Sequence, residues 1–207
     1  MIVVVGGHSR NIGKTSVVAG IISALREQQW TAVKITQFGH GVCSADGESC
    51  ECSTDPDHPY ALTRETSSTS GTDTARYLAA GARESLWLRT RSGELGFAMP
   101  ALRRMMARSP FLILESNSVM QFLRPELYLV VVDAATADFK NSSRLYLDRA
   151  DAFLGELATN AWASVAPRLV SGRPQFRLTA GFQPDDALLD FIRERVNRQL
   201  CPDVEPR

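Results

Sequence analysis

The chain alternates short apolar runs with longer stretches whose apolar residues recur at helical spacing. Continuous apolar runs are typical of strands in a sheet that is covered on both faces. Such runs predict strands at 1–5, 111–114, 127–132 and 152–154. Shorter segments with apolar or β-branched residues predict strands at 31–36 and 85–89 and an edge strand at 175–178. Helical spacing predicts helices at 14–29, 72–81, 97–108 and 184–200.

The alternation of strands and helices predicts an α/β fold with a three-layer, doubly wound and mostly parallel sheet that has helices on both faces. A chain of 207 residues with 44% hydrophobic content can bury one full core. We therefore expect one domain over 1–207. Residues 37–71 have few apolar positions and are rich in Cys, His, Ser, Thr and Asp, so they predict an insertion loop with a functional role.

The first apolar run leads directly into a Gly-rich turn that ends in Gly13-Lys14-Thr15-Ser16. The order of strand, Gly-rich turn, Gly-Lys-Thr and helix predicts a phosphate-binding loop (P-loop). The residues expected to hold the nucleotide are Gly7, Asn11, Ile12, Gly13, Lys14, Thr15 and Ser16. Lys14 would contact the β- and γ-phosphates as a catalytic group, and the Thr15 hydroxyl would reach Mg²⁺. The alternative is an ordinary strand-to-helix turn with a surface lysine.

Polar residues that follow the ends of predicted strands are the next candidates, because ligands of parallel sheets bind at the carboxyl ends of the strands. Lys34 is expected to contact phosphate or substrate, and Glu115 to act catalytically by holding Mg²⁺ or polarising the attacking group. Asp73 is a further candidate for Mg²⁺, or else a first-turn helix carboxylate. Asp133 has the same placement as Glu115, although Asp also commonly starts a turn.

The insertion loop carries His40, Cys43, Cys50 and Cys52, which together supply the imidazole and thiolate ligands that Zn²⁺ prefers. Their spacing is not that of paired C-x-x-C motifs. Free thiols, or a redox pair formed by Cys50 and Cys52, are the alternatives to Zn²⁺ binding.

Charge and hydropathy exclude several classes of partner. Lys and Arg number 23, as do Asp and Glu, so no basic field favours nucleic acid or a membrane surface. No apolar run approaches the ~20 residues of a membrane span, and the N-terminus lacks a basic leader. These features predict a cytoplasmic protein. No Asn-Lys-x-Asp segment for guanine recognition is present, which leaves ATP and GTP both open.

Several of these motifs together resemble the group of P-loop proteins that includes dethiobiotin synthetase, cobyrinic acid amidating synthases and MobB, the molybdopterin-guanine dinucleotide biosynthesis accessory protein. The segments that carry the resemblance are Val33-Lys34-Ile35, Gly39-His40-Gly41, Asp73-Thr74-Ala75-Arg76, Ala80-Gly81-Ala82 and the strand ending in Glu115. The step of six residues from Gly7 to Gly13 is similar to the dethiobiotin synthetase loop. Glu115 is followed by Ser116, where MobB-like proteins usually have Gly, and the cysteine insertion is not part of their pattern.

The resemblance implies a Mg²⁺-dependent ATP or GTP hydrolase of MobB type that assists assembly of the molybdenum cofactor or a related cofactor. Its partners would be the nucleotide, a cofactor-biosynthesis enzyme and a second copy in a homodimer. Two alternatives remain open. One is a ligase of dethiobiotin synthetase type that activates a carboxylate with ATP, and the other is a nucleotide-switched metallochaperone that uses the Cys/His loop.

Overall fold

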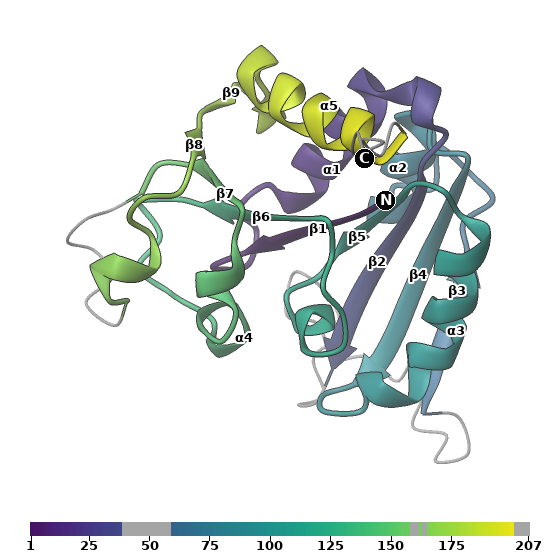
Figure 1. Cartoon of the computed structure of the whole chain (residues 1–207). Helices are drawn as coiled ribbons and strands as arrows, with labels where there is room; N and C mark the ends of the chain where they lie inside the picture. Colours follow the sequence, from purple (N-terminus) through teal and green to yellow (C-terminus); the bar gives the residue numbers. More distant parts are fainter. Residues whose placement is uncertain (39–58, 158–161, 163–164, 201–207) are drawn as a thin grey trace, which may run out of the picture.

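The computed structural model describes residues 1–38, 59–157, 162 and 165–200, and its centre is an eight-stranded sheet (Figure 1). The strands lie in the order β3-β4-β2-β5-β1-β6-β7-β8. Their bounds are β1 Ile2–Gly7, β2 Thr31–Phe38, β3 Tyr60–Arg64, β4 Glu84–Arg91, β5 Leu112–Glu115, β6 Leu127–Val132, β7 Ala152–Gly155 and β8 Gln175–Phe176. Neighbouring strands are parallel except for β3, which runs antiparallel to β4.

β1 occupies the middle of the sheet because its sequence is apolar throughout and can be buried on both faces. It pairs with β5 in the register Ile2↔Leu112 and with β6 in the register Val3↔Leu127. The carboxyl ends of β1, β2, β5 and β6 therefore meet at one edge of the sheet.

Helices cover both faces of the sheet, so the prediction of a doubly wound α/β fold is confirmed. The helices are α1 Lys14–Ala24, α2 Asp73–Ala79, α3 Leu95–Arg108, α4 Asn141–Arg144 and α5 Asp186–Leu200. Residues of α1, α2 and α5 pack on one face around Val3 and Val5, and α3 packs on the other around Val4 (Figure 1). None of the described helices is both long and apolar enough to cross a membrane.

The structure differs from the sequence-based expectation mainly where chain segments are exposed. The helix predicted over 14–29 ends at Ala24 and continues as a 3₁₀ turn, Arg26–Gln28. Strand β3 lies inside the segment 37–71, which was expected to be a loop. The prediction missed it because β3 is a short edge strand with no fully buried residue, so no continuous apolar run marks it. The edge strand predicted at 175–178 is divided between β8 and β9 Leu178–Thr179, and β9 pairs with β10 Gln183–Pro184 in a small hairpin.

Short 3₁₀ turns complete the connections between the longer elements. They are Ser118–Gln121, Leu147–Arg149 and Pro167–Leu169. The first follows β5 and the second precedes β7.

Candidate functional site

The loop between β1 and α1 is shaped by two glycines. Gly13 precedes the helix with a φ of 85°, in the left-handed region that favours glycine. A Cβ atom at Gly13 would lie 2.2 Å from Cγ of Phe182, which the hairpin β9–β10 places against the loop. A Cβ atom at Gly7 would lie 2.8 Å from Cδ of Lys14. Side chains at either position would therefore disturb the loop.

The loop directs positive charge toward its own interior. The Lys14 ammonium donates a hydrogen bond to the carbonyl of Ser9 at 2.9 Å and so spans the loop. Helix α1 begins without a side-chain cap and without an acidic residue in its first turn, which leaves its positive end for a ligand. Burial lowers the pKa of Lys14, the charge of Lys34 lowers it further, and the carboxylates of Glu115 and Asp73 oppose the change.

Lys34 brings three side-chain oxygen acceptors together at the end of this loop. Its ammonium donates to the Glu115 carboxylate at 3.3 Å, to the Thr15 hydroxyl at 3.4 Å and to the Asp73 carboxylate. Thr15 donates in turn to Oε2 of Glu115 at 2.9 Å. Glu115 is only 6% exposed. Burial alone would lower the pKa of Lys34, but the two carboxylates outweigh it and the pKa is raised.

The four residues of this cluster come from separate segments, and each had been a candidate from sequence. Thr15 lies in the first turn of α1, Lys34 lies in β2, Asp73 begins α2 and Glu115 ends β5. The structure places them together because the sheet order brings β2, β5 and β1 side by side.

Two further residues of α2 join the cluster, and neither was predicted from the sequence to lie there. The Tyr77 hydroxyl donates to Glu115, and Arg76 donates to the Ser16 hydroxyl at 2.8 Å. Burial, together with the charge of Glu115, raises the pKa of Tyr77 well above its usual range, so this phenol remains a donor. Asp73, Arg76 and Tyr77 follow at i, i+3 and i+4 on one helical face, which is the pattern that could have identified them.

The segment after β6 packs against the first half of the loop. His8 is fully buried between Phe139 and Trp162, with ring centroids 5.1 Å and 4.9 Å away. Its Nε2 bonds the Thr136 carbonyl at 3.1 Å, and the Trp162 indole donates to the same carbonyl at 3.0 Å. Since a carbonyl only accepts, Nε2 of His8 carries the proton. This aromatic contact fixes the loop's entry from β1.

Lys140 brings a further positive charge to the loop. Its backbone N–H donates to the His8 carbonyl at 2.8 Å, while Ser9 donates to the Asp138 carboxylate at 2.9 Å. Burial, followed by the charges of Lys14 and Arg10, lowers the pKa of Lys140 to about 8. The chain contains three lysines, and all of them lie at this loop.

Asn117 holds the loop from the side of β5. Its side chain accepts from the Gly7 N–H and donates to the Gly7 carbonyl, both at 2.8 Å. The two bonds fix the backbone at the point where β1 ends. This contact has no signal in the sequence, because Asn117 follows Glu115 in a segment without a strong pattern.

Asp133 starts a turn, which was the alternative to a ligand role. Its carboxylate accepts from the Ala135 N–H at 3.0 Å and from the Thr136 hydroxyl at 2.7 Å. These two bonds lower the pKa of Asp133. Beside it lies a cavity of about 300 Å³, lined by the ends of β6 and β7 and by the β9–β10 hairpin with Phe182.

The remaining candidates divide between the loop and the undescribed segment. Asn11 has a φ of 52° and Ile12 is buried, so both shape the loop. His40, Cys43, Cys50 and Cys52 lie outside the described residues, and Zn²⁺ binding there stays a prediction. Among the described residues, no three His, Cys, Asp or Glu side chains gather as a metal site.

The cluster around Lys34 nevertheless fits Mg²⁺ in the chemistry of its donors. Magnesium takes oxygen ligands and usually binds through one or two carboxylates together with substrate phosphates. Thr15, Asp73 and Glu115 supply one hydroxyl and two carboxylates, and they already surround a positive charge, that of Lys34.

Comparison with known proteins leaves the family open. No family model matches this chain, and no curated protein matches it. Among solved structures it is similar to the "apo" form of LpxK from Aquifex aeolicus in complex with ATP, with a TM-score of 0.44 and 14% sequence identity. The match covers 97% of this chain and 67% of that one. Likeness at this level carries no argument about function, which has to be inferred from the site itself.

Proposed function

We propose that this chain binds a nucleoside triphosphate with Mg²⁺ at the loop Gly7–Ser16 and hydrolyses it. One observation carries the proposal: Thr15, Asp73 and Glu115, from three separate elements, converge on the Lys34 ammonium at the positive end of α1. Helix N-termini and Gly-Lys-Thr loops bind phosphate. Carboxylates that hold a cation beside such a loop have a clear use in phosphoryl transfer.

Each residue then has a defined role in the proposed reaction. Lys14 would leave the Ser9 carbonyl for the β- and γ-phosphates, where its charge stabilises the transition state. Thr15, Asp73 and Glu115 would hold Mg²⁺, which neutralises charge on the phosphates when bound. Lys34, displaced from the carboxylates, would be free to contact the γ-phosphate. Arg76, which bonds Ser16, would keep the start of α1 in place.

The cavity beside Asp133 has the position needed for the nucleoside. Phe182 reaches from this cavity to Gly13, so the cavity opens next to the loop. An aromatic ring offers a stacking surface for a base. Glu156 and Arg177 also line the cavity and supply an acceptor and donors for the base edge, which fits adenine or guanine.

A role of MobB type in cofactor assembly is the more specific form of this proposal. It rests on the resemblance of the segment Asp73-Thr74-Ala75-Arg76 to that group. Two contacts support giving this segment a part in the site, since Asp73 bonds Lys34 and Arg76 bonds Ser16.

The experiment that tests nucleotide binding compares Lys14→Ala with the parent protein. Thermal unfolding is followed with ATP, GTP and their diphosphates in the presence of Mg²⁺, because a ligand that binds the native state raises its apparent stability. We expect a triphosphate to raise the Tm of the parent and to leave that of Lys14→Ala unchanged.

Arg103→Ala is the matched control, since Arg103 is an exposed residue of α3 on the opposite face of the sheet. It should respond to nucleotide as the parent does. Equal Tm shifts for the parent and Lys14→Ala would contradict the proposal, and so would a parent protein that responds to none of the four nucleotides.

A further inference from the structure

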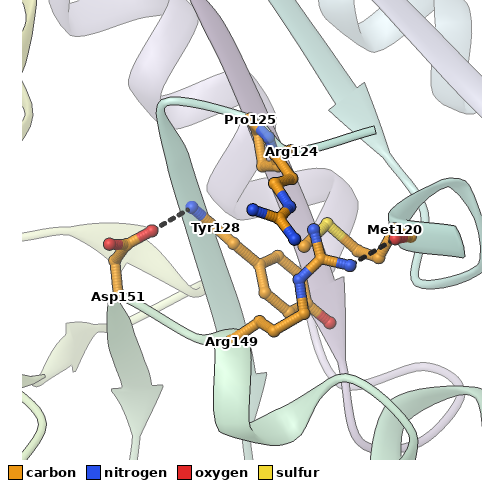
Figure 2. Close-up of a pocket in the computed structure, with 6 residues that line it drawn as sticks. All are labelled: Met120, Arg124, Pro125, Tyr128, Arg149 and Asp151. Atoms are coloured by element: carbon orange, nitrogen blue, oxygen red, sulfur yellow. Dashed lines mark hydrogen bonds between the residues drawn. The ribbon is translucent and has the colours of Figure 1, made fainter. Parts of the chain in front are cut away.

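A second cavity, of about 420 Å³, lies away from the nucleotide loop (Figure 2). Its lining residues are Met120, Arg124, Pro125, Tyr128, Arg149 and Asp151. Tyr128 belongs to the core on the α3 face of the sheet, whereas α1 packs on the other face. None of these six residues has a role in the proposed nucleotide site.

Two guanidinium groups share one side of this cavity. Figure 2 shows Arg124 and Arg149 directed toward the same region, beside the ring of Tyr128. Arg149 donates to the Met120 carbonyl at 2.5 Å and to the Leu123 carbonyl at 2.8 Å, which fixes its position. Three of the five N–H groups of an arginine remain after these two bonds. Arg124 is exposed and donates no hydrogen bond to any residue that the structure describes.

The acidic residue of the cavity does not neutralise this pair. The Asp151 carboxylate accepts from the backbone N–H of Tyr128 at 2.8 Å, on the side away from the guanidinium groups in Figure 2. It also forms an ion pair with Arg195 at 3.8 Å. Two like charges therefore face one region, and an anion between them would remove their repulsion.

The rest of the cavity is apolar. Met120 and Tyr128 are almost completely buried, and Pro125 is half-buried beside them. Burial raises the pKa of Tyr128, and the positive charge of Arg149 does not reverse this, so the phenol stays neutral. The cavity thus combines an apolar wall with two guanidinium groups. Small-molecule sites use this combination, with apolar contacts for affinity and polar groups for orientation.

We propose that this cavity binds a small molecule that carries a phosphate or carboxylate group on an apolar ring or chain. Its anion would lie between Arg124 and Arg149, and its apolar part against Tyr128, Met120 and Pro125. The proposal does not rest on the proposed nucleotide function, since the cavity shares no residue with the loop Gly7–Ser16. Tyr128 does touch the support of that loop, because its hydroxyl donates to Oδ1 of Asn117 at 3.3 Å.

Phenyl phosphate is a suitable probe, and its binding is measured by isothermal titration calorimetry. All titrations use the Lys14→Ala background, so that phosphate binding at the loop does not contribute. We expect one molecule of phenyl phosphate to bind each chain, with an affinity that falls as salt is raised. Adding Arg124→Ala should weaken binding about tenfold or more, as expected for the loss of charge-assisted hydrogen bonds. Adding Arg103→Ala should change nothing.

Two further probes define the chemistry of the ligand. Benzoate in place of phenyl phosphate shows whether the two guanidinium groups prefer a carboxylate or a phosphate. Binding of either anion supports the site. Benzyl alcohol keeps the ring but has no charge, and it should bind far more weakly. The proposal is overturned if neither anion binds, if the neutral probe binds as well as the anions, or if Arg124→Ala binds phenyl phosphate with unchanged affinity.

Discussion

The Lys34 ammonium compensates two carboxylates at once, so its removal should have a large effect on stability. Lys34→Met keeps an unbranched stem of similar length and deletes the charge. Glu115, 6% exposed, would then keep only the hydrogen bonds from Thr15 and Tyr77. Breaking a buried ion pair from one side costs about 3–5 kcal/mol, because it leaves an uncompensated buried charge.

The lower end of that range applies here. The Asp73 side chain is 33% exposed and that of Lys34 is 20% exposed, so water screens part of the interaction. We therefore expect a loss of about 3 kcal/mol, a large part of the 5–15 kcal/mol that typically separates folded from unfolded chains. Urea unfolding followed by circular dichroism measures it.

Two comparisons separate the charge effect from a packing effect. Lys34→Met/Glu115→Gln removes both charges of the buried Lys34–Glu115 pair and leaves only Asp73, which is 33% exposed, so it should recover most of the lost stability. Mg²⁺ should stabilise Lys34→Met more than the parent, since no ammonium then competes for the carboxylates. At 100 times its Kd a bound ion contributes about 2.7 kcal/mol. A Lys34→Met variant whose free energy of unfolding lies within about 0.5 kcal/mol of the parent, or equal stabilisation of both proteins by Mg²⁺, would show that the Lys34 charge does not compensate the carboxylates.

Three other variants test the loop by urea unfolding. Lys140 has a pKa of about 8 in the folded protein and an ordinary pKa of 10.5. Burying its charge therefore destabilises the fold fully below pH 8, and this destabilisation disappears toward pH 10.5. Lys140→Met should raise the free energy of unfolding by on the order of 1–3 kcal/mol at pH 7 and leave it unchanged at pH 10.5. Equal increases at the two pH values would contradict this expectation. Gly13→Ala should cost at least about 2 kcal/mol through its positive φ and its overlap with Phe182, and Gly13→Ala/Phe182→Ala should recover the packing part. Asn117→Ala should lower the free energy of unfolding by about 2 kcal/mol, because Gly7 loses both of its hydrogen bonds to this side chain. An unchanged urea midpoint would show that these two bonds do not stabilise the loop.

The central part of the fold could be predicted from sequence because its strands are buried on both faces. β1 and β6 are almost wholly apolar, and each forms where the apolar run predicted it. β3 could not be predicted in this way, since it is a short edge strand and no residue of it is fully buried. It becomes a strand only because the edge of β4 offers hydrogen-bond partners.

The site shows the same division. Lys34 and Glu115 were candidates because residues at strand ends meet at one edge of a parallel sheet. Asp73 was a candidate for Mg²⁺ or a carboxylate in the first turn of a helix. The Tyr77 hydroxyl finds Glu115 only through the packing of α2. The position of Lys140 beside the loop depends on how the segment after β6 folds back on His8. Helical spacing could place Tyr77 on the same face as Asp73, but the partner that each side chain finds is set by tertiary structure.

The central position of β1 also fixes the order in which the chain can fold. Both of its neighbours in the sheet come more than 100 residues later in the chain, at residues 112–115 and 127–131. Until the ribosome has produced them, an apolar segment with open hydrogen-bonding edges has no place to pair. Contacts of such long sequence separation close slowly. The segment that leads into the loop Gly7–Ser16 is thus exposed to aggregation for most of the synthesis of the domain.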